Sequence, residues 1–262
     1  MKPTLRCTVK IERDVAALVH ARNAFSFLHN RQPLLSLASR WQRGDSLSHD
    51  IQVIAIGKSG YGKSTTLNQL VGEAVFETNA IAGCTREMQS AEYRFPTKEA
   101  QCHFSLADLP GIGEHPELDK QYIQLYRDAI AKAHSVIYFL RADQRDYVID
   151  QWAFAQLFNT DAERRKVIIA LNAVDKIEPL NRSQPFALTA EQIQSLRLKR
   201  HTICQQFAVC EDQIVTLSAT EQHNLDGLVD RLADVLQPYL SQADTTSAYQ
   251  AHWTSSVNGA TY

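Results

Sequence analysis

The chain has 262 residues, enough for one large or two small domains, and its 44% hydrophobic content is ordinary for a protein with a buried core. Its 27 basic and 29 acidic residues give a net charge of −2, so no overall field draws it to nucleic acid or to anionic lipid. No apolar run approaches the ~18 residues of a membrane-spanning helix, and the first residues lack the apolar region of a secretory signal. We therefore expect a soluble, cytoplasmic protein with no membrane span.

The five cysteines form no C-x-x-C pair, which argues against a disulfide framework or a zinc site and favours reduced thiols. His201, Cys204 and Cys210 are spaced so that a metal cluster is an alternative, but two of them share a helix with ordinary core spacing.

Residues 11–42 carry apolar residues at helical spacing and no strand signals, with a break near Pro33. Two helices of this length cannot bury a core alone, so we expect them to pack on the following domain or on a partner. Turn residues at 44–46 mark the boundary. The sequence therefore predicts an N-terminal helical extension over residues 1–45.

From Asp50 onward, strand patterns alternate with helical patterns, as in α/β proteins whose strands are joined by crossover helices. The predicted strands are residues 51–56, 87–95, 101–108, 135–140, 166–171 and 213–217. The predicted helices are residues 63–73, 118–133, 146–158, 191–207 and 225–240. One sheet thus accounts for a domain over residues 46–240, and residues 241–262, rich in Ser, Thr and Ala, are predicted to form a flexible tail.

Residues 57–64 read GKSGYGKS and fit the phosphate-binding pattern G-x-x-x-x-G-K-S, with a strand before it and a helix after it as the pattern requires. Glycines let the backbone turn its N–H groups toward phosphate oxygens, and the helix start adds partial positive charge. Lys63 is predicted to reach the β- and γ-phosphates, and the Ser64 hydroxyl to take one position on Mg²⁺. The residues predicted to contact nucleotide here are Gly57, Lys58, Ser59, Gly60, Tyr61, Gly62, Lys63, Ser64 and Thr65.

The strand over residues 101–108 ends in Asp108-Leu109-Pro110-Gly111. A carboxylate at the carboxyl end of a strand beside the phosphate loop is placed to hold the water shell of Mg²⁺. The Gly111 N–H could approach a γ-phosphate because no side chain intervenes.

Asp175 indicates that the bound base is guanine, because one carboxylate can accept from both the N1–H and the N2 amino group of guanine. Adenine N1 is an acceptor, and facing it with a buried carboxylate would cost about 1–3 kcal/mol. The last strand ends at Ser218-Ala219, where a backbone N–H near Ala219 is predicted to donate to guanine O6. Asn172, Asp175, Lys176, Ser218 and Ala219 are therefore assigned to the nucleotide site.

Together these stretches resemble the signature set of the Era-like GTPases, a class that includes Era, the tRNA-modification GTPase TrmE, septins and the immunity-related GTPases. Residues 108–114, 141–145 and 171–179 carry a closer likeness to short prophage-associated bacterial GTPases. The resemblance covers about residues 50 to 240. It implies an α/β fold, a Ras-like P-loop G domain with a mixed, mostly parallel six-stranded sheet, one antiparallel edge strand and helices on both faces.

The resemblance also implies site roles. Thr85, in a loop over residues 80–87, would contact Mg²⁺ and the γ-phosphate. Catalysis would then rest on Lys63, Thr85 and Gly111, and the metal on Ser64, Thr85 and Asp108.

Three departures from the family pattern bear on function. Ala173 stands where a lysine normally covers the base, and Gly60 where K⁺-using relatives carry asparagine. Ile112, which follows D-x-x-G, cannot orient water as a glutamine would. We predict a Mg²⁺-dependent GTPase that cycles between GTP and GDP states, with slow intrinsic hydrolysis that K⁺ does not stimulate. The alternative is a septin-like protein that uses nucleotide to hold an interface, with little turnover.

Other residues leave two interpretations open. Arg86 is an arginine finger, in cis or across a homodimer, or an ordinary surface charge, and Glu114 and His115 position water or are solvated loop residues. The basic run over residues 197–201 could touch RNA, but its alternation with apolar residues is more typical of a solvated helix face. Binding to nucleic acid or the ribosome is therefore not supported by the sequence.

Overall fold

The computed structural model describes residues 12–14, 50–72, 74–78, 88–96, 101–112 and 116–240. The predicted helical extension and the predicted tail fall outside these residues, apart from a short strand, β1 (Glu12–Asp14), which the sequence pattern did not predict.

All six predicted strands form one mixed sheet, with β1 as an added edge. They are β2 (Asp50–Gly57), β3 (Gln89–Pro96), β4 (Gln101–Asp108), β5 (Ser135–Arg141), β6 (Val167–Asn172) and β7 (Ile214–Thr216). The strand order is β1-β3-β4-β2-β5-β6-β7, and the one antiparallel pairing is β3 with β4. The parallel strands β5 and β6 are apolar and almost wholly buried, as expected of strands covered on both faces.

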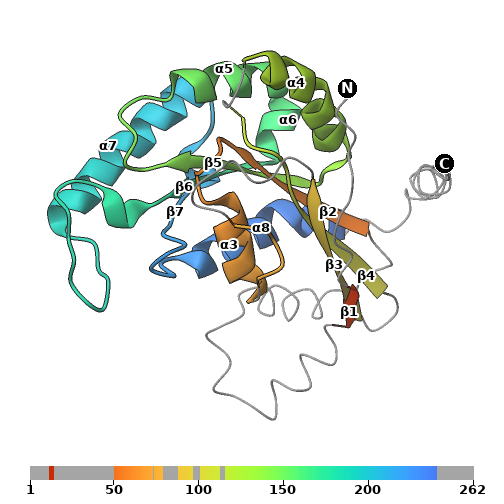
Figure 1. Ribbon diagram of the computed structural model, residues 1–262, viewed down its shortest axis with the longest axis horizontal. Helices are drawn as coiled ribbons and strands as arrows, with labels where there is room; N and C mark the ends of the chain where they lie inside the picture. The colour runs from red at the N-terminus through yellow and green to blue at the C-terminus, as the bar shows by residue number, and fades with distance from the viewer. Residues whose placement is uncertain are drawn as a thin grey trace, which may run out of the picture.

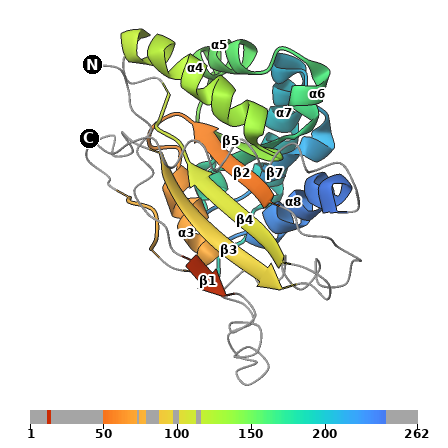
Figure 2. The same cartoon turned by 90° about the vertical axis from the view of Figure 1, so that its right-hand side faces the viewer.

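Helices cover both faces of the sheet (Figure 1). Apolar residues of α3 (Lys63–Val71) and α8 (Leu225–Leu240) pack against one face, with Val53 and Ala55 of β2. On the other face, α4 (Pro116–Lys132), α5 (Val148–Leu157) and α7 (Ala190–Phe207) pack against Ile54 and Ile56. Figure 2 shows β1, β3 and β4 side by side at one edge of the sheet. The fold class predicted from the sequence, a Ras-like α/β domain, is confirmed.

Helix starts follow local chemistry. Thr189 and Gln192 form a capping box at the start of α7, with each side chain bonded to the other's backbone. The sequence analysis missed α6 (Asp161–Arg165), although Thr160 and Glu163 make the same kind of capping box. The five residues of α6 bury no side chain, so no apolar periodicity marks them.

Within the described part of the chain, every helix is too short or too polar to cross a membrane.

Candidate functional site

The polar motifs gather at one end of the sheet because parallel strands place their carboxyl ends along the same edge. β2 leads into the glycine-rich loop over residues 57–62, and β4 ends at Asp108. β6 ends at Asn172, and Ser218 follows β7. The phosphate, metal and base motifs predicted from the sequence therefore share one edge.

Lys63, the first residue of α3, is buried and turned back over the loop. Its Nζ donates to the carbonyl oxygens of Gly57 and Lys58, each at 3.1 Å. The ammonium is thus held inside the curve of the loop, beside the start of α3, where backbone N–H groups and the helix dipole favour anions. This arrangement suits a phosphate group.

Asp108 is fully buried and its Oδ2 accepts a 2.5 Å hydrogen bond from the Ser64 hydroxyl. Its other oxygen, Oδ1, is buried with no hydrogen-bond partner in the described structure. Burial raises the pKa of this carboxyl, while the charge of Lys63 and the Ser64 hydrogen bond lower it. A hydroxyl beside a carboxylate with an unused oxygen is a donor set of the hard kind that Mg²⁺ prefers, so Ser64 and Asp108 fit the predicted metal.

Gly111 lies directly against the phosphate loop. A Cβ added to Gly111 would stand 2.6 Å from the Ser59 nitrogen and 2.7 Å from its Cα. The next residue continues this contact, because the Ile112 N–H donates to the Gly57 carbonyl at 3.2 Å. The Ile112 side chain is 4% exposed and belongs to the apolar cluster on the α4 side of the sheet, so it faces away from solvent.

Asn172 joins three motif loops rather than standing free for a ligand. Its Nδ2 donates to the Tyr61 carbonyl at 2.9 Å, and its Oδ1 accepts from the Ala219 N–H at 3.1 Å. The sequence predicts a backbone N–H near Ala219 as a donor to guanine O6, and in this structure the Ala219 N–H itself donates to Asn172. Asp175, by contrast, has a buried Oδ1 with no partner among the described residues, as a carboxylate awaiting two donors would.

A second buried carboxylate lies under the phosphate loop, and the sequence analysis did not identify it. The Asp150 side chain, on α5, has no exposed surface. Its Oδ2 accepts from the Tyr61 hydroxyl at 3.2 Å and stands 3.7 Å from the Lys58 Nζ. The side chains of Lys58 and Tyr61 thus face α5, while their carbonyls accept from Lys63 and Asn172. No sequence signal links a helix residue to a loop 89 positions earlier.

The remaining predicted residues are placed as follows. Thr85, with Arg86, Glu114 and His115, lies outside the described residues. Lys176 is exposed, Ser218 is buried, and Thr65 is half-buried in the first turn of α3. His201 pairs with Gln205, and the described part of the chain holds no group of three His, Cys, Asp or Glu side chains that could hold a metal ion.

Two residues of the basic run on α7 form hydrogen bonds to backbone carbonyls elsewhere in the protein. Lys199 donates to the carbonyls of Ala142 and Gln144 at 2.6 and 2.5 Å, and Arg200 bonds the Glu211 carbonyl at 3.1 Å. Burial lowers the pKa of Lys199, against the attraction of Asp143. Two of these charges therefore serve the fold and are neither a fully solvated face nor an open surface for RNA.

Comparison with known proteins agrees with this geometry. Residues 52–173 match the family described as 50S ribosome-binding GTPase. The chain is 31% identical over 159 residues to the uncharacterized protein YfjP of Escherichia coli (strain K12), covering 60% of this chain and 53% of YfjP. It spans about half or less of the length of the curated relatives it matches, which include GTPase Era and GTPase Der.

Solved structures show the same fold. Era in complex with MgGDPNP and nucleotides 1506–1542 of 16S ribosomal RNA superposes with a TM-score of 0.54 at 26% identity, over 75% of this chain and 58% of that one. A structure reported as showing that dimerization is important for the GTPase activity of chloroplast translocon components atToc33 and psToc159 gives a TM-score of 0.56 at 17% identity, over 83% and 92% of the two chains. The second likeness shows the fold alone.

Proposed function

We propose that this chain, which carries a P-loop GTPase domain similar to that of Era, binds GTP and GDP and hydrolyses GTP with Mg²⁺. The observation that carries the proposal is that two motif carboxylates, the buried Asp108 and the partly exposed Asp175, each have a buried Oδ1 with no partner among the described residues, as Asp150 under the phosphate loop also does. One lies beside Ser64 and the phosphate loop, and the other lies where the base is predicted. Unused buried oxygens are costly, so their presence at two ends of one site favours a ligand with donors or positive charge at both.

The chemistry asked of the protein is hydrolysis of GTP to GDP and phosphate, with water as the attacking group. Lys63 and the loop N–H groups would hold the charge that develops on the phosphates, and Ser64, Thr85 and Asp108 would hold the metal directly or through water. Mg²⁺ would supply further neutralisation of that charge when bound. The GTP and GDP states would differ in the segments around Thr85 and after Gly111, which gives a switch.

Turnover is expected to be slow. The side chain after Gly111 is Ile112, which is buried against the core and can neither donate to nor accept from an attacking water. The group that orients water would come from elsewhere, such as Arg86, Glu114 or His115 in cis, or a second copy of the chain. A homodimer across the nucleotide would resemble the dimerization named for atToc33 and psToc159.

A second candidate is the septin-like protein that binds nucleotide to hold an interface. One observation favours it: α5 exposes the apolar side chains of Val148, Ile149 and Trp152. The same helix is bonded to α4, because Arg127 donates to the Gln156 carbonyl. These side chains are 66%, 46% and 42% exposed, which is unusual for three apolar residues on two turns of one helix.

One experiment tests the proposal. Binding of GDP, ADP and xanthosine diphosphate is measured by calorimetry, and phosphate release from GTP is followed at several protein concentrations. GDP should bind much more tightly than ADP, and Asp175→Asn should weaken GDP and improve xanthosine diphosphate, whose O2 replaces the amino donor. Lys63→Ala should abolish triphosphate binding or hydrolysis.

The outcomes separate the candidates. Equal affinity for GDP and ADP would reject the guanine assignment. Tight GDP binding with less than one phosphate released per protein at every concentration would favour the interface protein over the enzyme. Hydrolysis that rises with protein concentration would favour a group supplied by a second copy.

A further inference from the structure

Arg141, the last residue of β5, lies between the phosphate loop and the base loop. β5 pairs with β2 on one side, where Phe139 is the partner of Gly57, and with β6 on the other, where Arg141 is the partner of Asn172. Arg141 therefore stands beside the residue that precedes Ala173. Ala173 is the position where the family lysine is absent.

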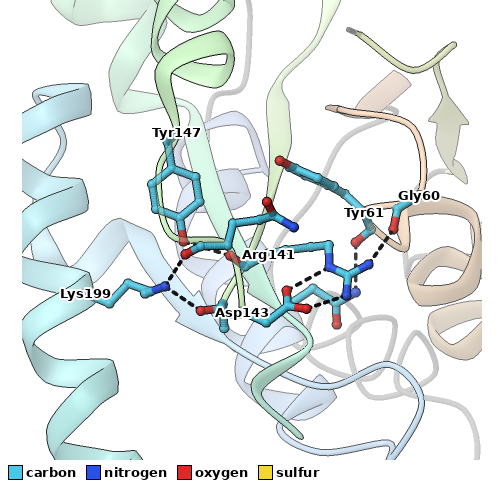
Figure 3. A network of polar contacts seen from close by, with 9 residues as sticks. Gly60, Tyr61, Arg141, Asp143, Tyr147 and Lys199 are labelled. Carbon is cyan, nitrogen blue, oxygen red and sulfur yellow. Dashed lines mark hydrogen bonds and ion pairs between the residues drawn. The ribbon is translucent and has the colours of Figure 1, made fainter. Parts of the chain in front are cut away.

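Two neighbouring strand ends hold two consecutive carbonyls of the phosphate loop. Arg141 Nη1 donates to the Gly60 carbonyl at 3.4 Å, and Asn172 Nδ2 donates to the Tyr61 carbonyl at 2.9 Å. Figure 3 shows the Arg141 guanidinium reaching past Asp143 to the loop at Gly60 and Tyr61. The bond from Arg141 is long and therefore weak, so it orients the guanidinium toward the loop without binding it tightly.

The plane of the guanidinium is fixed by its other contacts. Nε and Nη2 donate to the two carboxylate oxygens of Asp143 at 2.9 and 2.6 Å, a bidentate pair. The Asp143 hydrogen bond and charge raise the pKa of Arg141, and in spite of burial the same contact lowers the pKa of Asp143. The backbone behind them is held by Lys199, and the Tyr147 hydroxyl donates to the Arg141 carbonyl at 2.7 Å (Figure 3). A guanidinium held this way loses little entropy when it meets a ligand.

Donors remain available on this group. A guanidinium has five N–H groups, and the hydrogen bonds of Arg141 to described residues use three of them, on Nε, Nη1 and Nη2. One N–H on each terminal nitrogen thus has no described acceptor, and the side chain is 24% exposed. The charge of Asp175 adds to the raised pKa of Arg141, after the larger effect of the Asp143 hydrogen bond.

We propose that Arg141 contacts the guanine nucleoside, its guanidinium plane lying against the face of the purine. A fixed, partly desolvated guanidinium is suited to stack on an aromatic ring. It would thereby replace, from the neighbouring strand, a cation that Ala173 cannot supply. This inference rests on the proposed function and adds a residue to its nucleotide site.

Calorimetric titration of nucleotide-free protein with GDP and with GTP-Mg²⁺ tests it. Arg141→Ala should weaken both nucleotides by a similar factor of about 5 to 30, the usual range for a desolvated cation–π contact. Arg141→Gln, whose amide can still donate toward the Gly60 carbonyl, should lose as much. Arg145→Ala is the matched control, an exposed arginine of the same loop, and should bind as the wild type does.

Rescue separates a ligand contact from a purely structural role. Ala173→Lys in the Arg141→Ala background should recover most of the lost affinity, because it returns a cation to the base loop. Ala173 already has φ 61°, so a longer side chain adds no new backbone conformation there. If Arg141 only shaped the phosphate loop, a cation at position 173 would restore nothing.

Each other outcome overturns the inference. Unchanged affinity in Arg141→Ala, a loss confined to GTP, or no recovery with Ala173→Lys would each remove Arg141 from the nucleoside. If GDP fails to bind wild-type protein, or Asp175→Asn has no effect, the proposed function fails first and this inference with it. Normal GDP binding and a normal Asp175→Asn response, with an unaffected Arg141→Ala, would reject the Arg141 contact alone.

Discussion

Replacing Asn172 by alanine should destabilise the nucleotide-free protein, because its amide is a structural tie as well as part of a motif. The change removes two buried hydrogen bonds, one to the Tyr61 carbonyl at 2.9 Å and one from the Ala219 N–H at 3.1 Å. A buried polar group left without a partner costs about 1–3 kcal/mol. With water entering the space and restoring part of that loss, we expect the free energy of unfolding to fall by about 2–4 kcal/mol.

Urea unfolding of nucleotide-free protein measures this loss, and GDP titration of the same variants measures its effect on the site. Asn181→Ala is a matched control, because Asn181 also makes two side-chain bonds, to the Ala187 carbonyl and from the Ser183 N–H, but in an exposed loop. The control should change the free energy of unfolding by less than about 1 kcal/mol. Asn172→Asp keeps an acceptor for Ala219 but turns an oxygen toward the Tyr61 carbonyl, so it should lose at least as much as alanine at pH 7.

The reasoning would be refuted by an Asn172→Ala variant that unfolds within about 0.5 kcal/mol of the wild type. That result would mean that the three loops hold their positions without the amide. Asn172 would then matter only when nucleotide is bound, and a drop in GDP affinity alone would be the sign of it.

Three further substitutions test the surroundings of the phosphate loop. Gly111→Ala should cost about 1–3 kcal/mol of stability and weaken GDP binding, because the added Cβ would meet the Ser59 backbone. A Cβ on Gly60 would meet nothing within 4 Å, so Gly60→Ala should cost only its backbone strain of about 1–2 kcal/mol. Equal GDP affinity in the two variants would contradict this. Burial raises the pKa of Asp150, against the attraction of Lys58 and the Tyr61 hydrogen bond, so the native state keeps its proton to higher pH than the unfolded chain does. The stability of Asp150→Asn relative to the wild type should therefore rise with pH from about pH 4, by at most about 1.4 kcal/mol per pH unit, until the native carboxyl has ionised. A relative stability that is constant or falls over urea titrations from pH 4.5 to 8 would contradict the assignment.

Much of the fold could be predicted from the sequence because its signals are local. Strands such as β2, β5 and β6 are short, mainly apolar runs, and the motif residues stand where strands end, so a parallel sheet brings them together without further information. The start of α7 at Thr189 and Gln192 is equally local. The strand β1 is three residues long and paired to β3, and nothing in its composition distinguishes it from its neighbours in the chain.

The contacts that sequence reasoning missed depend on register and on which helix covers which strand. Arg141 reaches Gly60, 81 positions earlier in the chain, because β5 lies beside β2. Asp150 reaches Tyr61 because α5 covers the sheet under the phosphate loop. The one readable signal was the pair Arg141 and Asp143 at the end of an apolar run, two opposite charges where a strand leaves the core.

Buried carboxylate oxygens without partners cost stability, and this cost links ligand binding to folding. Asp108 and Asp175 each bury an oxygen that no described group satisfies, and Asp108 also carries a raised pKa from burial. A ligand that brings a cation to the first and two donors to the second removes both penalties, and only in the native state. Any ligand that binds the folded chain alone stabilises it by RT ln(1 + [L]/Kd), about 2.7 kcal/mol at a hundred times Kd. The cost of these unsatisfied carboxylate oxygens and the proposed affinity for guanine nucleotide should therefore change together, so a variant that relieves the cost should weaken the binding.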